Sequence, residues 1–230
     1  MKTVIGIDGA PGGWLAVIWG KTVTHQLFPN LHDALQLDAE IIAIDMPIGF
    51  PEFSGRRVEK IARQMLKGKA SSIFSVPARS AIENENASYQ DACLINMQHS
   101  APPKKFSKQS FGIFPKMREL DCLMTPELQT RVHEVHPELS FAEMNNSRAV
   151  LTKKSRPDGR SERIKLLGVS GFPWSQLPSA TYLKKDVTDN DIVDACACAW
   201  SARRILEGRA LSIPDQLEKD ARGLVMSIKV

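Results

Sequence analysis

The segment that most constrains the fold is a continuous apolar run at residues 40–46, with the sequence Glu-Ile-Ile-Ala-Ile-Asp-Met. Unbroken apolar runs of this length are typical of strands that are buried on both faces of a sheet. Asn30 is a suitable N-cap for a short helix that reaches Leu37, shortly before this run. A helix followed by a doubly buried strand indicates a parallel crossover, so we expect an α/β protein.

The other hydrophobic patterns extend this expectation to one α/β domain over residues 1–230. The chain begins with a predicted three-stranded meander, in which Gly20-Lys21 fits a tight hairpin turn. Residues 54–130 are mainly helical in pattern and are interrupted by five prolines, which predicts a helical insertion. The predicted strands are at residues 3–8, 14–19, 22–28, 40–46, 131–136 and 223–230. The predicted helices beyond Leu37 are near residues 57–66, 89–98, 116–123, 159–167 and 191–206, with another after Pro137.

Composition restricts the class of protein. The chain is 43% hydrophobic and 24% charged, which is typical of soluble globular proteins. No apolar stretch reaches about 18 residues, and the sequence becomes acidic at Asp8, too early for the apolar part of a signal peptide. We therefore expect a cytoplasmic protein that does not associate with a membrane. The four cysteines lack a CxxC pairing, which favours free thiols.

Positive charge is concentrated in two blocks, although the net charge is only +4. Residues 104–118 contain five basic residues and no acid, and residues 148–165 contain seven basic and two acidic residues. Such blocks either contact a phosphate backbone or form solvated loops, and the sequence allows both interpretations. The candidate phosphate-binding residues are Arg79, Lys108, Gln109, Lys153, Lys154, Arg160 and Arg163.

Five acidic residues lie at the edges of apolar segments, where burial of a lone carboxylate is costly. They are Asp8, Asp45, Glu134, Asp191 and Asp194. The first three lie in or at the ends of predicted strands, and the last two are three residues apart, on one face of a predicted helix. Small side chains directly after this pair would let the helix approach a sheet closely. If the three strands are neighbours, the carboxylates converge there.

Converging carboxylates repel one another, and burial raises their pKa values further. A divalent cation relieves both effects, and Mg²⁺ and Mn²⁺ prefer oxygen ligands. We therefore predict a Mg²⁺ or Mn²⁺ site formed by Asp8, Asp45, Glu134 and Asp194, with Asp191 as an accessory carboxylate. Two such ions would orient a water for attack on a phosphodiester bond. A role in a turn or a helix cap is the alternative for these acids.

His136 is a further candidate catalytic residue. It directly precedes Pro137 at the end of a predicted strand. A histidine at such a position either acts on the substrate, by orienting a water, transferring a proton or ligating a metal, or makes a structural hydrogen bond. The sequence leaves both interpretations open.

Several sequence blocks together match one known family. They include Ile-Asp-Met-Pro-Ile-Gly-Phe-Pro at residues 44–51 and Glu-Val-His-Pro-Glu at residues 134–138. The other blocks are residues 4–14, 71–79, 107–109 and 194–199. With these blocks the chain resembles domain-of-unknown-function family 429, a set of predicted nucleases with a ribonuclease H-like fold. The resemblance covers nearly the whole chain, and it implies a mixed five-stranded sheet flanked by helices, with metal-bound carboxylates at its centre.

The leading hypothesis is a metal-dependent nuclease that hydrolyses phosphodiester bonds in DNA or RNA. Residues 191–195 are also similar to the last-helix motif of Holliday-junction resolvases, which work as dimers, so we expect a homodimer. One alternative is a non-catalytic nucleic-acid-binding module of the same fold. Another is an actin-like phosphotransferase, because Gly6-Ile7-Asp8-Gly9 resembles a phosphate loop. That second alternative requires another nucleotide-binding lobe, for which a chain of 230 residues is too short.

Overall fold

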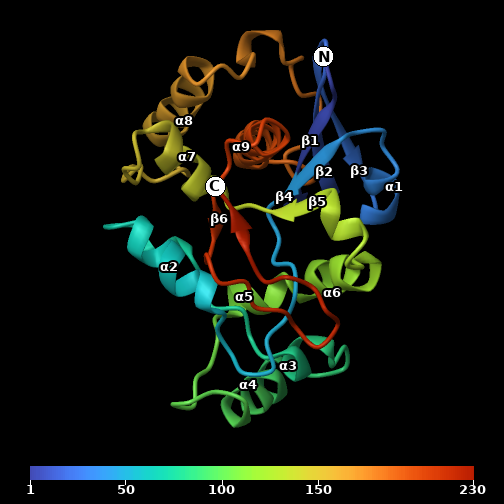
Figure 1. Cartoon of the computed structure of the whole chain (residues 1–230), viewed down its shortest axis with the longest axis vertical. Coiled ribbons are helices and arrows are strands. Elements are labelled where there is room, and N and C mark those ends of the chain that lie inside the picture. The colour runs from blue at the N-terminus through green and yellow to red at the C-terminus, as the bar shows by residue number, and fades with distance from the viewer.

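The computed structural model describes all residues 1–230, and a mixed five-stranded sheet forms its centre (Figure 1). The strands are β1 (Val4–Ala10), β2 (Gly13–Trp19), β3 (Val23–Phe28), β4 (Ile41–Ile44) and β5 (Val132–Glu134). They lie in the order β3-β2-β1-β4-β5. The first three form an antiparallel meander, whereas β4 and β5 run parallel to β1. The expected meander, parallel crossover and α/β class are therefore confirmed.

Helices surround this sheet and build most of the insertion. The α-helices are α1 (Leu31–Leu35), α2 (Arg57–Met65), α3 (Arg79–Glu83), α4 (Tyr89–Gln98), α5 (Lys108–Gly112), α6 (Phe114–Leu123), α7 (Pro137–Met144), α8 (Pro157–Val169) and α9 (Asp189–Leu206). The 3-10 turns are η1 (Ala70–Ser72), η2 (Leu128–Thr130) and η3 (Trp174–Gln176). The short helices α3 and α5 are the two that the hydrophobic pattern did not predict. None of the helices combines the length and the apolar character needed to cross a lipid bilayer. All four cysteines are free thiols.

The C-terminal segment differs from the strand expected at residues 223–230. Only Ile228–Lys229 forms a strand there, β7, which pairs with β6 (Ser212–Ile213) in a small separate sheet, while Val225 makes an isolated bridge to Lys219. The carboxylate of Asp220 accepts a hydrogen bond from the amide of Leu224 at 2.9 Å, which closes a turn at the start of the expected strand. After this turn the chain pairs first with Lys219, through Val225, and then with β6, so the pairing is divided between two short stretches.

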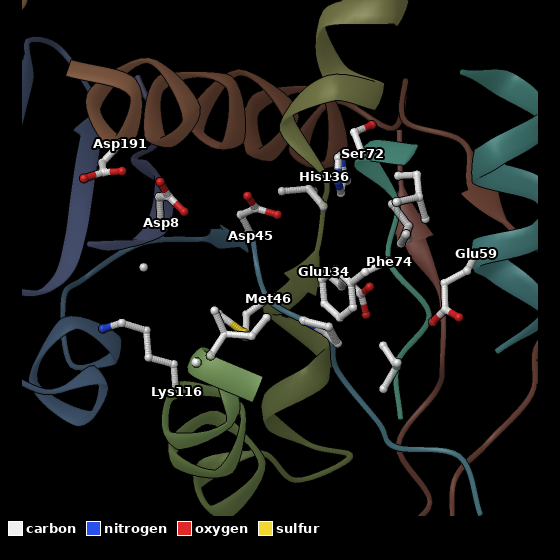
Figure 2. A pocket seen from close by; sticks show the side chains of 18 of the residues that line it. Asp8, Asp45, Met46, Glu59, Ser72, Phe74, Lys116, Glu134, His136 and Asp191 are labelled. Carbon is white, nitrogen blue, oxygen red and sulfur yellow. The ribbon is translucent and has the colours of Figure 1, made fainter. Parts of the chain in front are cut away.

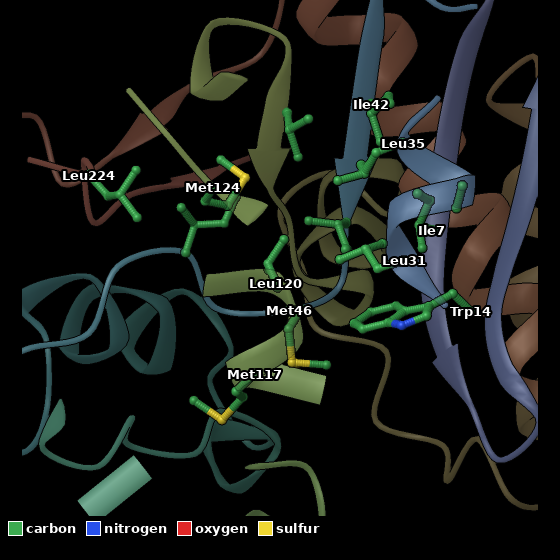
Figure 3. Packing of buried hydrophobic residues seen from close by; sticks show 14 of the residues in the cluster. Ile7, Trp14, Leu31, Leu35, Ile42, Met46, Met117, Leu120, Met124 and Leu224 are labelled. Atoms are coloured by element: carbon green, nitrogen blue, oxygen red, sulfur yellow. The ribbon is translucent and has the colours of Figure 1, made fainter. Parts of the chain in front are cut away.

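Each face of the central sheet carries its own apolar core. On one face, Ile7 and Trp14 belong to a cluster that also contains Met117 of α6 (Figure 3). On the opposite face, Val4 and Val17 pack with the small side chains of α9. Because the first cluster contains residues of both the sheet and the helical insertion, the insertion shares the core of the sheet.

Gly6 determines how closely α9 approaches β1. A Cβ atom added at this position would lie 2.0 Å from the backbone nitrogen of Ala199 and 2.2 Å from the carbonyl oxygen of Ala195. Real Cβ atoms essentially never lie within 3.0 Å of another heavy atom, and a backbone cannot move away as a flexible side chain can. The backbones of helix and strand are therefore in direct contact, as the run of small residues on this helix predicts.

Replacement of Gly6 by alanine is expected to destabilise the protein, because the added methyl group would overlap the backbone of α9. The expected loss in the free energy of unfolding is about 3 kcal/mol, the upper end of the usual range for overpacked cores, and denaturant titration measures it.

Gly168→Ala is the matched control for this variant. Gly168 lies inside α8, and a Cβ atom added there meets nothing within 4 Å. Since alanine is favoured over glycine in helices, this control is expected to gain up to about 1 kcal/mol. A Gly6→Ala protein as stable as the wild type would contradict the close approach of α9.

Candidate functional site

Three carboxylates from separate parts of the chain meet beneath α9. Asp8 lies on β1, Asp45 directly follows β4, and Asp194 lies near the start of α9. Since Ile7 of β1 pairs with Ile44 of β4, Asp8 and Asp45 occupy equivalent positions on adjacent parallel strands. Figure 2 shows these two side chains next to each other below the helix. We call Asp8, Asp45 and Asp194 the acidic cluster.

Burial raises the pKa of every member of the acidic cluster, and repulsion by neighbouring acids adds to the effect. The pKa of Asp8 lies well above its usual range because the group is buried and because other acids, Asp45 foremost, repel it. Burial and the charge of Asp194 raise the pKa of Asp45 to about 8. Burial also raises the pKa of Asp194, against the attraction of Lys154. The surroundings therefore do not compensate the full negative charge of the ionised cluster.

Lys154 pairs directly with the acidic cluster. Its Nζ donates a hydrogen bond to Oδ2 of Asp194 at 2.6 Å. Although burial acts in the opposite direction, the charge of Asp194 raises the pKa of Lys154. The second oxygen of this carboxylate, Oδ1, is buried and has no hydrogen-bond partner. One lysine thus satisfies only half of one carboxylate in a cluster of three.

The acidic cluster suits a hard divalent cation in charge and in donor type. Carboxylate oxygens are preferred ligands of Mg²⁺ and Mn²⁺, and the unpaired Oδ1 of Asp194 is a buried acceptor without a donor. In the present arrangement, no three His, Cys, Asp or Glu side chains lie close enough together to hold a metal ion. Asp8, Asp45 and Asp194 are the residues whose chemistry would hold one.

Glu134, the fourth expected ligand, is engaged elsewhere. Arg56 donates to both of its carboxylate oxygens, at 2.6 and 2.7 Å, and the amide of Ile48 donates to Oε2 at 2.7 Å. Arg56 also pairs with Glu59 at 2.7 Å. In Figure 2 Glu134 lies apart from Asp8, on the side of the site toward Glu59. Its place in the expected metal site is corrected to a buried ion pair, because the guanidinium of Arg56, which it shares with Glu59, already binds both of its oxygens.

A cavity of about 440 Å³ opens beside the acidic cluster, and His136 lies in its wall. Nδ1 of His136 accepts a hydrogen bond from the amide of Glu138 at 3.2 Å and so caps α7. Burial lowers the pKa of His136 to about 4. The imidazole is therefore neutral near neutral pH, where its structural hydrogen bond accounts for its position.

Asp191 combines the two roles that the sequence left open. Its Oδ2 accepts a hydrogen bond from the amide of Thr188 at 2.7 Å, which caps the start of α9. Its negative charge also contributes to the raised pKa of Asp8, and its side chain lines the same cavity. It is thus a helix cap that adds to the negative field of the site.

Lys116 of α6 is a residue of this cavity that the sequence did not single out. Its Nζ donates a hydrogen bond to the carbonyl oxygen of Gly13 at 2.6 Å and lies 4.7 Å from the centre of the Trp14 ring. Burial lowers the pKa of Lys116. Figure 2 shows its side chain reaching into the site from the side opposite α9. Its membership of the basic block at 104–118 was the only sequence signal.

Some of the candidate phosphate-binding residues border a second cavity, of about 700 Å³. Gln109, Lys153 and Lys154 lie in its wall. Lys108 does not, and its Nζ lies 5.9 Å from the centre of the Tyr89 ring. The two basic blocks thus meet at this cavity through one amide and two lysines.

The three candidate arginines have other partners. Arg160 pairs with an acid of α9 at 3.2 Å, beside a separate cavity. Arg79 reaches the buried carboxylate of Asp220 at 2.5 Å. Arg163 is completely buried and lies 2.9 Å from Glu138. The expectation that Arg79 and Arg163 bind phosphate is corrected, because internal carboxylates hold both guanidinium groups.

The model of a family described as "Protein of unknown function (DUF429)" matches residues 6–219. No curated protein and no solved structure matches the chain.

Asp45→Asn is expected to make the metal-free protein less sensitive to rising pH. Folded Asp45, with a pKa of about 8, keeps a proton that the unfolded chain releases near pH 4. Its contribution to stability is therefore fully present below about pH 4 and is lost as the pH rises to about 8. In EDTA, the variant is expected to have a higher Tm than the wild type at pH 8, with the advantage shrinking toward pH 4.

Asp38→Asn is the control for this comparison, because Asp38 is exposed and precedes β4, whereas Asp45 follows the other end of that strand. Its pH profile is expected to follow that of the wild type. If the dependence of Tm on pH were the same for Asp45→Asn as for the wild type, Asp45 would ionise as an ordinary exposed carboxyl group does, and the prediction would be wrong.

Proposed function

We propose that this chain, which belongs to the family described as "Protein of unknown function (DUF429)", is a divalent-metal-dependent nuclease with a ribonuclease H-like arrangement of its sheet and acidic residues. In this proposal Mg²⁺ or Mn²⁺ binds the acidic cluster, and the substrate is a phosphodiester of DNA or RNA. Hydrolysis takes place in the cavity between α9 and α6.

The acidic cluster is the observation that carries this proposal. Three carboxylates, of which Asp8 and Asp194 are buried and Asp45 is partly exposed, have raised pKa values, and one buried oxygen among them has no partner. Such an arrangement destabilises a protein unless a cation completes it. The open cavity of about 440 Å³ beside the cluster leaves room for a phosphate group next to that cation.

A bound divalent ion would supply the charge that orients the attacking water and stabilises the departing oxygen. The protein supplies the remaining groups. Lys116 reaches the cavity from the side opposite α9, and its contacts with Gly13 and Trp14 fix the position of its ammonium group. Because burial lowers its pKa, this ammonium group is a suitable general acid, which gives its proton to the departing oxygen as the phosphorus–oxygen bond breaks.

Asp8→Asn is expected to abolish Mn²⁺ binding in a calorimetric titration and to lower the cleavage rate more than about 100-fold. The substrates are labelled single strands, duplexes, RNA–DNA hybrids and four-way junctions. Asp189→Asn is the matched control, because this exposed acid lies in the first turn of α9 and does not line the cavity of the acidic cluster. The control is expected to keep both metal binding and cleavage.

Other outcomes of the same experiment favour the alternative functions. Nucleic-acid binding without Mn²⁺ binding by the wild type would overturn the nuclease proposal and favour a non-catalytic binding module. Saturable ATP binding without cleavage of any nucleic acid would favour a phosphotransferase.

Lys116→Met is expected to slow cleavage about 100-fold at neutral pH, the lower part of the usual contribution of a general acid. Its Mn²⁺ affinity is expected to stay unchanged, and the decline of the rate at high pH, where Lys116 loses its proton, is expected to disappear.

Lys116→Arg separates charge from proton transfer, because arginine keeps its positive charge but does not release a proton at accessible pH. It is expected to be as slow as Lys116→Met. Full activity of Lys116→Arg would show that the charge alone matters at this position, and melting curves of both variants check that they are folded.

A further inference from the structure

The second cavity adjoins the cavity of the acidic cluster. Segments far apart in the sequence build its wall: η1, the starts of α5, α7 and α9, and the loop before α8. Asp45, His136 and Lys154 lie in the walls of both cavities. A polymer held at the acidic cluster can therefore continue into the second cavity without crossing the protein surface elsewhere.

The lining of the second cavity is rich in groups that bind phosphate and sugar oxygens. Only two of its 16 lining residues are hydrophobic. Serine hydroxyl groups and the amide groups of Gln109 and Asn190 dominate the wall. Protein contacts to the nucleic-acid backbone use hydroxyl, amide and lysine side chains of this kind.

Among the charged side chains that line the second cavity, one lysine has no ion-pair partner. Its only carboxylate outside the acidic cluster, Glu138, already pairs with Lys69 and Arg163, each at 2.9 Å. Lys69 is also fixed by donating to two backbone carbonyl oxygens. Lys153, by contrast, is exposed and forms no ion pair. An anion that enters this cavity thus meets a lysine without a partner.

The second cavity lacks an exposed aromatic side chain on which a base could stack. Neither tryptophan nor tyrosine lines it, and its two aromatic side chains, Phe74 and His136, are both half-buried. Proteins that hold bases commonly stack them on exposed aromatic side chains. A strand in this cavity would therefore be held by its backbone.

We propose that the second cavity binds the sugar–phosphate backbone of a nucleic-acid strand beside the bond that is cut, without reading its bases. The inference rests on the proposed function, since it places the strand whose phosphodiester the acidic cluster would hold. Lys153 contacts a phosphate, and Gln109 donates to a neighbouring backbone oxygen.

The test measures binding in EDTA by fluorescence anisotropy. The probes are a labelled oligothymidylate of about 12 nucleotides, within the length that small single-strand-binding domains cover, and an abasic oligomer of the same length. We expect both probes to bind the wild type within about twofold of each other. We expect Lys153→Gln to weaken both roughly fivefold and to reduce the slope of log K against log salt by about 0.7, the value for one phosphate contact with a single strand.

Lys165→Gln is the matched control, because it removes the same charge from the same basic block at an exposed position that lines neither cavity. It is expected to bind both probes as the wild type does. Failure of the abasic oligomer to bind, or equal binding by Lys153→Gln and the control, would overturn the backbone site. Cleavage with Mn²⁺ is assayed separately, so a protein that cleaves but fails these tests keeps the proposed function and loses only this inference.

Discussion

The direct contact between the backbones of α9 and β1 is the constraint on which the rest of the site depends. Gly6 removes the side chain that would separate them, and the small residues that follow Asp194 remove those of the helix. The first turns of α9 are therefore held over the end of the sheet, where Asp8 and Asp45 emerge on adjacent strands. A larger residue at either surface would move one carboxylate away from the other two.

The acidic cluster differs from other buried carboxylates of the protein in its ion pairing. Glu134 is paired with Arg56, which it shares with Glu59, and Glu138 is paired with Arg163 and a lysine. In both cases a rigid guanidinium group satisfies the carboxylate inside the protein. The acidic cluster has three carboxyl groups and a direct ion pair only with Lys154. The acidic cluster is thus a place where three carboxyl groups share one lysine beside an open cavity that gives access to a cation from solvent.

Local patterns predicted those parts of the structure that depend on short-range physics. The meander and the doubly buried strand follow from hydrophobic periodicity, and Asp8 and Asp45 were found because they end such strands. Local patterns do not reveal which residues far apart in the sequence form ion pairs in the fold. Arg56 reaches Glu134 from the insertion, 78 residues away, so the sequence could not separate this glutamate from the acidic cluster. The same limitation makes Arg163 a candidate phosphate-binding residue in the sequence, since its helix has nearly no amphipathic pattern to show which side faces inward.

The charge of the second cavity is tied to that of the acidic cluster through Lys154. The side chain of Lys154 is 47% exposed, whereas that of Asp194 is 4% exposed. A lysine that leaves this pair regains water at little cost, but the carboxylate it leaves remains buried and unpaired. Departure of Lys154 is therefore favourable only if another positive charge takes its place at Asp194. A cation bound at the acidic cluster would take this place and release the ammonium group of Lys154 toward the second cavity. Cation binding at the first cavity would therefore increase the attraction of the second cavity for an anion.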